Sequence, residues 1–186
     1  FLEGYYGQAG KYIKEYMTLL HDNLEKSGEE LSIFGNALTP VNGYLSPENL
    51  DAYSQCFDKA EKVVADDKDL TARVQFARLP VIFAELEQAS LMPVGKRGFL
   101  IDGKDGDLSV NEDFMHKLDH FISCCKVNNT RRLCEWMTPV DEYKEEMTDV
   151  PLQYLKFLAK GNKALGKPAT VNLPLTRYGA KGTGSL

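Results

Sequence analysis

The segment from residue 69 to residue 89 restricts the fold more than any other part of the chain. It carries two apolar stripes at helical spacing: Leu70, Val74, Ala77, Val81 and Ala84 on one, and Phe76, Leu79, Phe83 and Leu86 on the other. A helix that is apolar on two sides must be buried between neighbouring helices. Pro80 inside the segment removes one amide donor and predicts a kink. The pattern therefore predicts a central helix with a partner on each side.

Two amphipathic segments precede this central helix. Residues 9 to 26 place apolar side chains, among them Tyr12 and Tyr16, on one stripe, and Gly28 is a suitable C-terminal stop. Ser46 as N-cap and Pro47 at the first helical position begin a second helix. The turn-rich stretch between the two helices is predicted to form a loop.

More helices are predicted after the central one. Residues 90 to 108 are rich in glycine and predict a long loop. Ser109 and Glu112 form a capping box that begins a helix, which ends near residue 128. Another helix begins at residues 138 to 141, and residues 152 to 160 predict one more short helix. We therefore expect an all-α fold, an irregular bundle of four to six helices within residues 1 to 160.

The last residues differ from the rest in composition. Residues 161 to 186 are rich in glycine and proline, and no helical pattern fits them. They predict a linker with one short extended piece, ATVNLPL at residues 169 to 175. We expect an extended C-terminal tail.

Charge and hydropathy exclude several classes of partner. The 186 residues carry a net charge of -5, and no basic patch with interleaved aromatic side chains is present, so we expect no nucleic-acid partner. No apolar run approaches the roughly 20 residues of a membrane span. The four cysteines, Cys56, Cys124, Cys125 and Cys134, form no CxxC pair and predict free structural thiols. A bridge from Cys134 to the 124/125 pair stays open in an oxidising compartment.

One set of residues has the spacing of metal ligands. Glu112, His116 and His120 lie four residues apart on a predicted helix, and two such histidines can share a metal ion. They project away from the core stripe of that helix and have no fourth ligand, so we predict no metal and no cofactor. A small metal-dependent enzyme built on these three residues remains an alternative. The run IDGKDGDLSVNE fits no calcium-loop register and predicts a turn before a capped helix.

Catalytic motifs give no further lead. The chain contains no GxSxG, HExxH, phosphate-loop or GxGxxG pattern. Its many carboxylates leave a glycosidase-like acid–base pair open, although most lie on polar helix faces. Glu85 and Glu87 lie on the central helix near Arg78, where an internal ion pair is favoured over catalysis.

The tyrosines divide into two groups. Tyr12 and Tyr16 have the spacing of the buried stripe and are predicted to lie in the core. Tyr5, Tyr6 and Tyr44 flank loops, where an aromatic face can stack on a sugar ring or form part of an interface. These three tyrosines, together with Arg97 in the long loop, are the candidate substrate or interface residues.

Three segments carry a resemblance to a known family. FLEGYYGQAGKYIKEYMTLLHD, SPENLDAYSQCFDKAEKVV and LTARVQFARLPVIFAELE resemble the C-terminal helical region of a Bacteroides-type family of uncharacterised glycoside-hydrolase-like proteins. The resemblance covers roughly residues 1 to 160. The tail NLPLTRYGAKGTGSL is similar to the opening of a discoidin-like carbohydrate-binding β-sandwich. Residues 161 to 186 are thus expected to form a linker and the start of a following β domain.

The resemblance implies a function and a set of partners. Members of this family carry a (β/α)₈ barrel upstream, so the chain is expected to be a non-catalytic helical accessory domain of an exported, glycan-degrading protein. Its expected partners are that barrel and carbohydrate, and its expected location is periplasmic or extracellular. The missing starting Met and signal peptide fit a chain that enters from a preceding domain. The resemblance transfers no catalytic residue.

Two expectations separate this hypothesis from its alternatives. An accessory domain should expose an apolar patch around Leu2, Tyr5, Tyr6 and the 91–101 loop, and should hydrolyse no glycoside by itself. A free-standing helical interaction module, the main alternative, should instead bind a protein partner without any carbohydrate. Whether the parent protein is an enzyme is left open by the residues.

Overall fold

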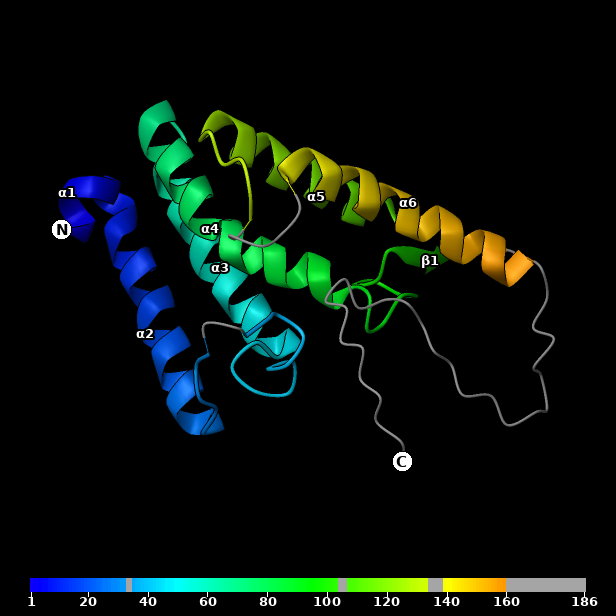
Figure 1. The fold of residues 1–186 in the computed structure, drawn as a ribbon. Coiled ribbons are helices and arrows are strands. Elements are labelled where there is room, and N and C mark those ends of the chain that lie inside the picture. Colours follow the sequence, from blue (N-terminus) through cyan, green and yellow to red (C-terminus); the bar gives the residue numbers. More distant parts are fainter. Residues whose placement is uncertain (33–34, 104–106, 134–138, 160–186) are drawn as a thin grey trace.

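A computed structural model describes residues 1–32, 35–103, 107–133 and 139–159 of the chain, and the fold is all-α, as predicted. The elements follow one another along the chain (Figure 1) as α1 (Leu2–Tyr6), a 3₁₀ helix η1 (Gly7–Ala9), α2 (Gly10–Ser27), α3 (Pro47–Val63), α4 (Lys68–Gln88), β1 (Leu100–Asp102), β2 (Leu108–Val110), α5 (Glu112–Val127) and α6 (Val140–Ala159). Residues 134–138, which include the start of a predicted helix, and the tail 160–186 lie outside the described residues.

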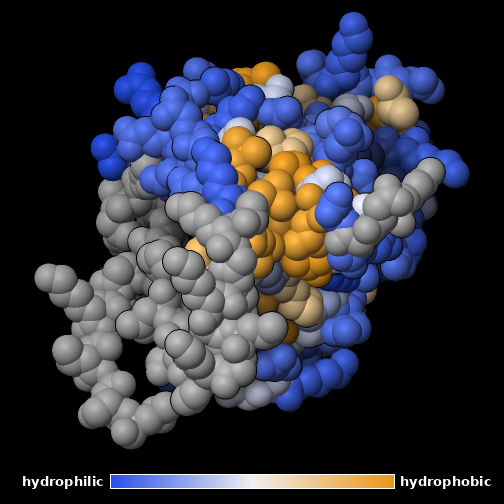
Figure 2. Space-filling view, turned by 90° about the vertical axis from the view of Figure 1, so that its right-hand side faces the viewer, coloured by the Kyte–Doolittle hydropathy of each residue, from blue (hydrophilic) through white to orange (hydrophobic). Residues whose placement is uncertain are grey.

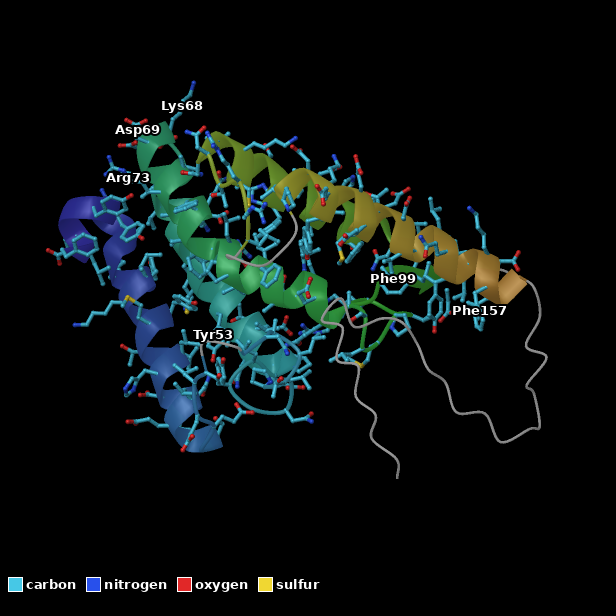
Figure 3. The ribbon with its side chains drawn as sticks, in the orientation of Figure 1. Tyr53, Lys68, Asp69, Arg73, Phe99 and Phe157 are labelled. Atoms are coloured by element: carbon cyan, nitrogen blue, oxygen red, sulfur yellow. The ribbon has the colours of Figure 1, made fainter. Side chains whose placement is uncertain are left out.

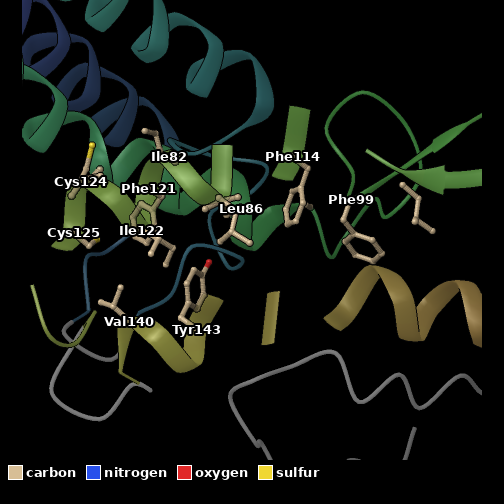
Figure 4. Packing of buried hydrophobic residues seen from close by; sticks show 14 residues of the cluster. Ile82, Leu86, Phe99, Phe114, Phe121, Ile122, Cys124, Cys125, Val140 and Tyr143 are labelled. Carbon is tan, nitrogen blue, oxygen red and sulfur yellow. The ribbon is translucent and has the colours of Figure 1, made fainter. Parts of the chain in front are cut away.

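Helix α4 is the centre of the bundle, as its two apolar stripes predicted. It packs against α3 on one side and α5 on the other, and α2 and α6 form the outer layers (Figure 1). The stripe that contains Val74 and Val81 belongs to a first cluster, which joins α4 to α2 and α3. The stripe that contains Leu79 and Leu86 belongs to a second cluster, which joins α4 to α5 and α6 (Figure 4). In Figure 1 the ribbon of α4 changes direction partway along, and Pro80 lies in its interior.

The helix ends in the first half of the chain follow the sequence signals. The Ser46 side chain accepts a hydrogen bond from Asn49 N at 3.3 Å, and Pro47 occupies the first turn of α3. Gly28 ends α2 with φ of 67°, a left-handed conformation that glycine adopts without a steric penalty. Asp67 is the N-cap of α4, and its side chain accepts hydrogen bonds from the amides of residues 69 and 70.

The predicted capping box of α5 is wrong. Ser109 lies in β2, and the N-cap of α5 is Asn111, whose side chain accepts from Asp113 N at 3.1 Å. The amide group of Asn111 also donates to Gly98 O at 2.8 Å. Asn111 therefore caps the helix and holds the preceding loop, which local spacing could not indicate.

The long predicted loop also contains a small sheet. β1 and β2 pair antiparallel, with Leu100 opposite Val110 and Asp102 opposite Leu108. Each strand has only three residues, which is too short for a period-two pattern to stand out from the surrounding glycines. The sheet covers one end of the second cluster, where Leu100 is fully buried.

The two short helices predicted after residue 138 are one continuous helix, α6. Pro151, which directly precedes the predicted 152–160 helix, lies inside α6 and is buried. Val150, Tyr154 and Leu155 pack against the second cluster on both sides of this proline. Tertiary packing on both sides therefore keeps α6 helical at Pro151, although proline removes one of the helix hydrogen bonds.

Candidate functional site

The candidate residues Tyr5 and Tyr6 form an aromatic corner at the N-terminal end of the bundle. The rings of Phe1 and Tyr5 stack with centroids 5.6 Å apart, and the Tyr6 ring meets Tyr5 edge-on at 4.8 Å. Arg73 of α4 points towards α1 (Figure 3), and its guanidinium carbon lies 4.8 Å from the centroid of the Tyr5 ring. Its Nη1 also donates to Tyr5 O at 2.8 Å. We call Phe1, Tyr5, Tyr6 and Arg73 the aromatic corner.

Two glycines allow the chain to build this corner. Gly7 ends α1 with φ of 55°, which a residue with a side chain rarely adopts. A Cβ on Gly10 would lie 2.8 Å from the carbonyl carbon of Leu2, so α1 can fold back onto the start of α2 only because residue 10 is glycine. As a result, Phe1 is 94% exposed and Tyr5 41% exposed, whereas Leu2 and Tyr6 are half-buried. Burial raises the pKa of the Tyr6 hydroxyl, and the neighbouring Tyr5 adds to this effect.

Tyr44 lies at the other end of the α2–α3 pair, in the loop before α3 (Figure 1). Its carbonyl accepts from the Tyr53 hydroxyl at 2.7 Å, and its amide donates to Glu29 Oε2 at 3.3 Å. The pKa of the Tyr44 hydroxyl is raised by burial and then by the nearby Glu29 carboxylate. The structure therefore separates Tyr44 from the aromatic corner and gives its backbone a structural role.

Arg97 is held against α3 rather than left free in its loop. Its Nη2 lies 2.5 Å from Asp51 Oδ2 and donates to Pro47 O at 2.8 Å. It lines a cavity of about 280 Å³ with Glu85 and Lys117. Those two residues pair with each other at 2.6 Å between Lys117 Nζ and Glu85 Oε2. Arg97, Asp51, Glu85 and Lys117 around this cavity are thus paired across elements.

The central ion pairs differ from the predicted ones. Arg78 binds Asp58 Oδ1 at 2.7 Å and Glu61 Oε1 at 3.1 Å, both on α3, instead of Glu85 or Glu87. Burial lowers the pKa of the Arg78 guanidinium, but its two carboxylate partners outweigh this effect, so the net shift is upward. Sequence spacing along α4 could not reveal these partners, because they lie on a neighbouring helix.

An acidic pocket that the sequence did not predict lies between α4 and α6. It has a volume of about 500 Å³ and includes Glu87, which is buried. The Tyr143 hydroxyl donates to Glu87 Oε1 at 3.0 Å. Four acidic residues of α6 complete the charged part of the lining: Glu142, Glu145, Glu146 and Asp149. Only the packing of α6 against the second cluster brings these carboxylates together with Glu87.

The metal candidates are not assembled into a site. Glu112, His116 and His120 are all exposed on α5, and His120 Nε2 lies 3.7 Å from the Cys124 sulfur. Within the described ranges, the only group of possible ligands whose ligand atoms all lie within 4.8 Å of one another is His21, Asp22 and Glu25 on α2. All three are exposed, and nothing further marks them as ligands.

The described cysteines behave as buried, free thiols. Cys56, Cys124 and Cys125 form no disulfide, as predicted, and burial raises the pKa of each thiol. The pKa of Cys125 rises to about 11, first through burial and then through the adjacent Cys124. A thiol of this kind is a poor nucleophile near neutral pH. Cys134 lies outside the described residues, so its predicted alternative bridge stays a prediction.

No helix in the described part of the chain is both long and apolar enough to cross a membrane. Comparison of the chain with family models, curated proteins and solved structures gave no match.

Proposed function

We propose that this chain is a non-catalytic helical accessory domain of a multidomain, exported glycan-degrading protein, and that it packs on an upstream (β/α)₈ barrel through the aromatic corner. The observation that carries the proposal is the exposure of large apolar side chains at this corner. Phe1 is 94% exposed and Tyr5 is 41% exposed, although both belong to a stack of rings. The family resemblance supplies the kind of domain that would cover them.

The chemistry of the corner is typical of a protein interface. Aromatic and arginine side chains are enriched among residues that dominate binding energy. Arg73 contacts both the face of the Tyr5 ring and the Tyr5 carbonyl, which fixes the orientation of the ring. The ring therefore loses little conformational entropy when a partner covers it. Leu91 and Met92, in the loop where exposure was also expected, are 47% and 51% exposed, but they follow the opposite end of α4 from Arg73 and form no single patch with the corner.

The pockets of this chain support a non-catalytic role. The charged groups of Arg97, Glu85 and Lys117 are already engaged in ion pairs, which leaves none of them poised as an acid or base. Buried Glu87 accepts a hydrogen bond from Tyr143, which ties it to the packing of α6. The carboxylates of Glu85 and Glu87 thus have structural partners.

A binding experiment with the barrel domain tests the proposal. The chain should bind the separately purified barrel of its parent protein in isothermal titration calorimetry. Tyr5→Ala should weaken this binding on the order of tenfold or more, because it removes a central ring of the corner. The matched control is Val127→Ala, which removes another exposed apolar side chain at the end of α5 and should leave the affinity unchanged.

Two outcomes would contradict the proposal. One is the absence of binding between the two purified domains. The other is turnover of an aryl glycoside by the isolated chain that persists at constant specific activity through purification.

A further inference from the structure

Helix α2 forms an outer layer of the bundle, and one long side of it faces away from the other helices. It lies at the left edge of the view in Figure 1, with α3 on its inner side. Five side chains at spacings of three and four residues lie on the outer side: Lys11, Lys14, Thr18, Asp22 and Glu25. The two lysines and the threonine are exposed, and the carboxylate side chains are 49% and 70% exposed. We call these five residues the α2 face.

A shallow surface groove runs along this face. Its lining includes both lysines, Thr18 and Asp22, together with Glu15 and Leu19. Glu15 is the acidic residue nearest to the two lysines in sequence, but its Oε1 is bound by Lys59 Nζ of α3 at 3.0 Å. The α2 face therefore presents positive charge at one end and negative charge at the other.

The order of these charges does not favour the helix itself. Lys11 and Lys14 lie towards the N-terminal end of α2, and Asp22 and Glu25 lie towards its C-terminal end. The helix macrodipole favours the opposite order, with acidic side chains near the N-terminus and basic side chains near the C-terminus. A partner helix that runs in the reverse direction would complement both ends.

We propose that two copies of this chain associate through the α2 face, with their α2 helices antiparallel about a two-fold axis at Thr18. Lys11 and Glu25 each lie seven residues from Thr18, and Lys14 and Asp22 each lie four residues from it. An antiparallel copy therefore brings its two carboxylates level with the two lysines. A two-fold interface repeats every contact, so the same set of charge pairs forms at both ends.

The side chains at the axis suit a close approach of the two helices. Packed helices lie about 8 to 10 Å apart, and a crossing angle of about 20° keeps them in contact over several turns. Thr18 places a small side chain at the crossing point, and the longer lysines lie one and two turns away. Met17, which is 53% exposed, lines a second groove together with Thr18. Two-fold symmetry brings the two Met17 side chains to the same side of the axis, where they add apolar contact area.

This surface differs from the apolar surfaces of the molecule. The α2 face shares no residue with the aromatic corner. The hydrophobic side chains at the centre of Figure 2 lie on the right-hand side of Figure 1, across the molecule from α2. Exposed charge pairs are individually weak and are screened by salt, whereas apolar contacts are not weakened by it. We therefore expect a weak dimer whose affinity falls with ionic strength.

Sedimentation equilibrium of the full 186-residue chain tests the dimer. A change from about 50 mM to about 500 mM NaCl should raise its dissociation constant on the order of tenfold or more. An acidic double variant, Lys11→Glu with Lys14→Glu, and a basic double variant, Asp22→Lys with Glu25→Lys, should each weaken self-association by a similar factor, because like charges then face each other. An equimolar mixture of the two variants should form a heterodimer, because every facing pair is again opposite in charge.

A matched variant controls for the change in net charge. Lys62→Glu with Lys68→Glu makes the same charge change at exposed positions of α3 and α4. It should dimerise as the parent does and should form no heterodimer with the basic variant. Circular dichroism checks that every variant keeps its helices.

Three results would overturn the proposal. The first is a parent chain that stays monomeric at about 1 mM protein in low salt, since a weaker contact is not a specific interface. The second is a dimer that salt does not weaken, which would assign the contact to the apolar surface shown in Figure 2. The third is a mixture of the acidic and basic variants that forms no heterodimer.

Discussion

At the scale of single residues, buried tyrosines connect the first cluster to its polar neighbours. Tyr53 is fully buried, and its hydroxyl accepts from Asn23 Nδ2 at 3.1 Å while it donates to Tyr44 O. Tyr16 packs its ring against Tyr53 and Phe57, with centroids 5.5 and 4.7 Å away. Burial, and then the neighbouring Tyr53, raises the pKa of Tyr16 to about 12. Tyr12 and Tyr16 of α2 are half-buried and pack against the first cluster, on the side that their spacing predicted.

This pKa shift predicts how stability depends on alkaline pH. The Tyr16 hydroxyl keeps its proton more strongly in the folded chain than in the unfolded chain, where its pKa is near 10. The stabilisation is thus fully present below pH 10 and is lost as the pH rises towards 12. The free energy of unfolding, measured in urea from pH 9 to pH 11.5, should fall across this window. Tyr16→Phe should make the fall shallower, and an equal slope in both proteins would contradict the assignment.

At the scale of elements, one asparagine joins the hairpin to α5. Asn111 is 4% exposed, caps the helix through its side-chain oxygen and donates from its side-chain nitrogen to Gly98 O. The residue that local spacing favoured, Ser109, is exposed in β2. The position of the N-cap was decided by the loop that folds back over it, because only Asn111 reaches both partners.

A pair of substitutions separates these two residues. Asn111→Ala should lower the free energy of unfolding by about 2 kcal/mol, because it removes a cap and leaves a buried carbonyl without its donor. Ser109→Ala should change the free energy by less than about 0.5 kcal/mol, as expected for an exposed position. Urea unfolding followed by circular dichroism measures both. If Ser109→Ala lowered the free energy of unfolding more than Asn111→Ala, the predicted capping box at Ser109 would be correct after all.

At the scale of the whole molecule, α4 belongs to two hydrophobic clusters at once. Its first stripe packs with α2 and α3, and its second with α5 and α6. Arg78 adds a polar link from α4 to α3 through Asp58 and Glu61. Both clusters lose part of their buried side chains if α4 unfolds. The first cluster with α2 and α3, and the second cluster with α5 and α6, should therefore unfold together.

This shared helix predicts a single unfolding transition. Phe57→Ala in the first cluster and Leu118→Ala in the second remove fully buried side chains, and each should cost about 3 to 5 kcal/mol. Both variants should still unfold in one transition, with coincident loss of amide protection in α2 and α5. The exposed Val63→Ala is the control and should stay within about 0.5 kcal/mol of the parent. If the amides of α5 lost their protection before those of α2 in Leu118→Ala, the two clusters would unfold independently.

Some residues of the candidate site could be predicted from the sequence, whereas their long-range contacts could not. The sequence singled out Tyr5 and Tyr6 because they flank a loop, and they do meet at one corner. It could not indicate that Arg73, almost seventy residues away, would lie against the Tyr5 ring, since no local pattern reports a contact between α1 and α4. Tyr44 and Arg97 were selected on similar grounds, but Glu29 after α2 and residues of α3 hold them in structural contacts.

The sequence by itself determined the helical class, the approximate bounds of four helices, the start of α3 and the central place of α4. These features follow from side chains within one or two turns of each other, which a linear pattern records. Only the tertiary structure decided the hairpin, the cap at Asn111, the continuity of α6 through Pro151, and the partners of Arg78 and Glu87. Each of these depends on groups that are distant in sequence, and their packing and hydrogen bonds outweigh the local preferences that the sequence displays.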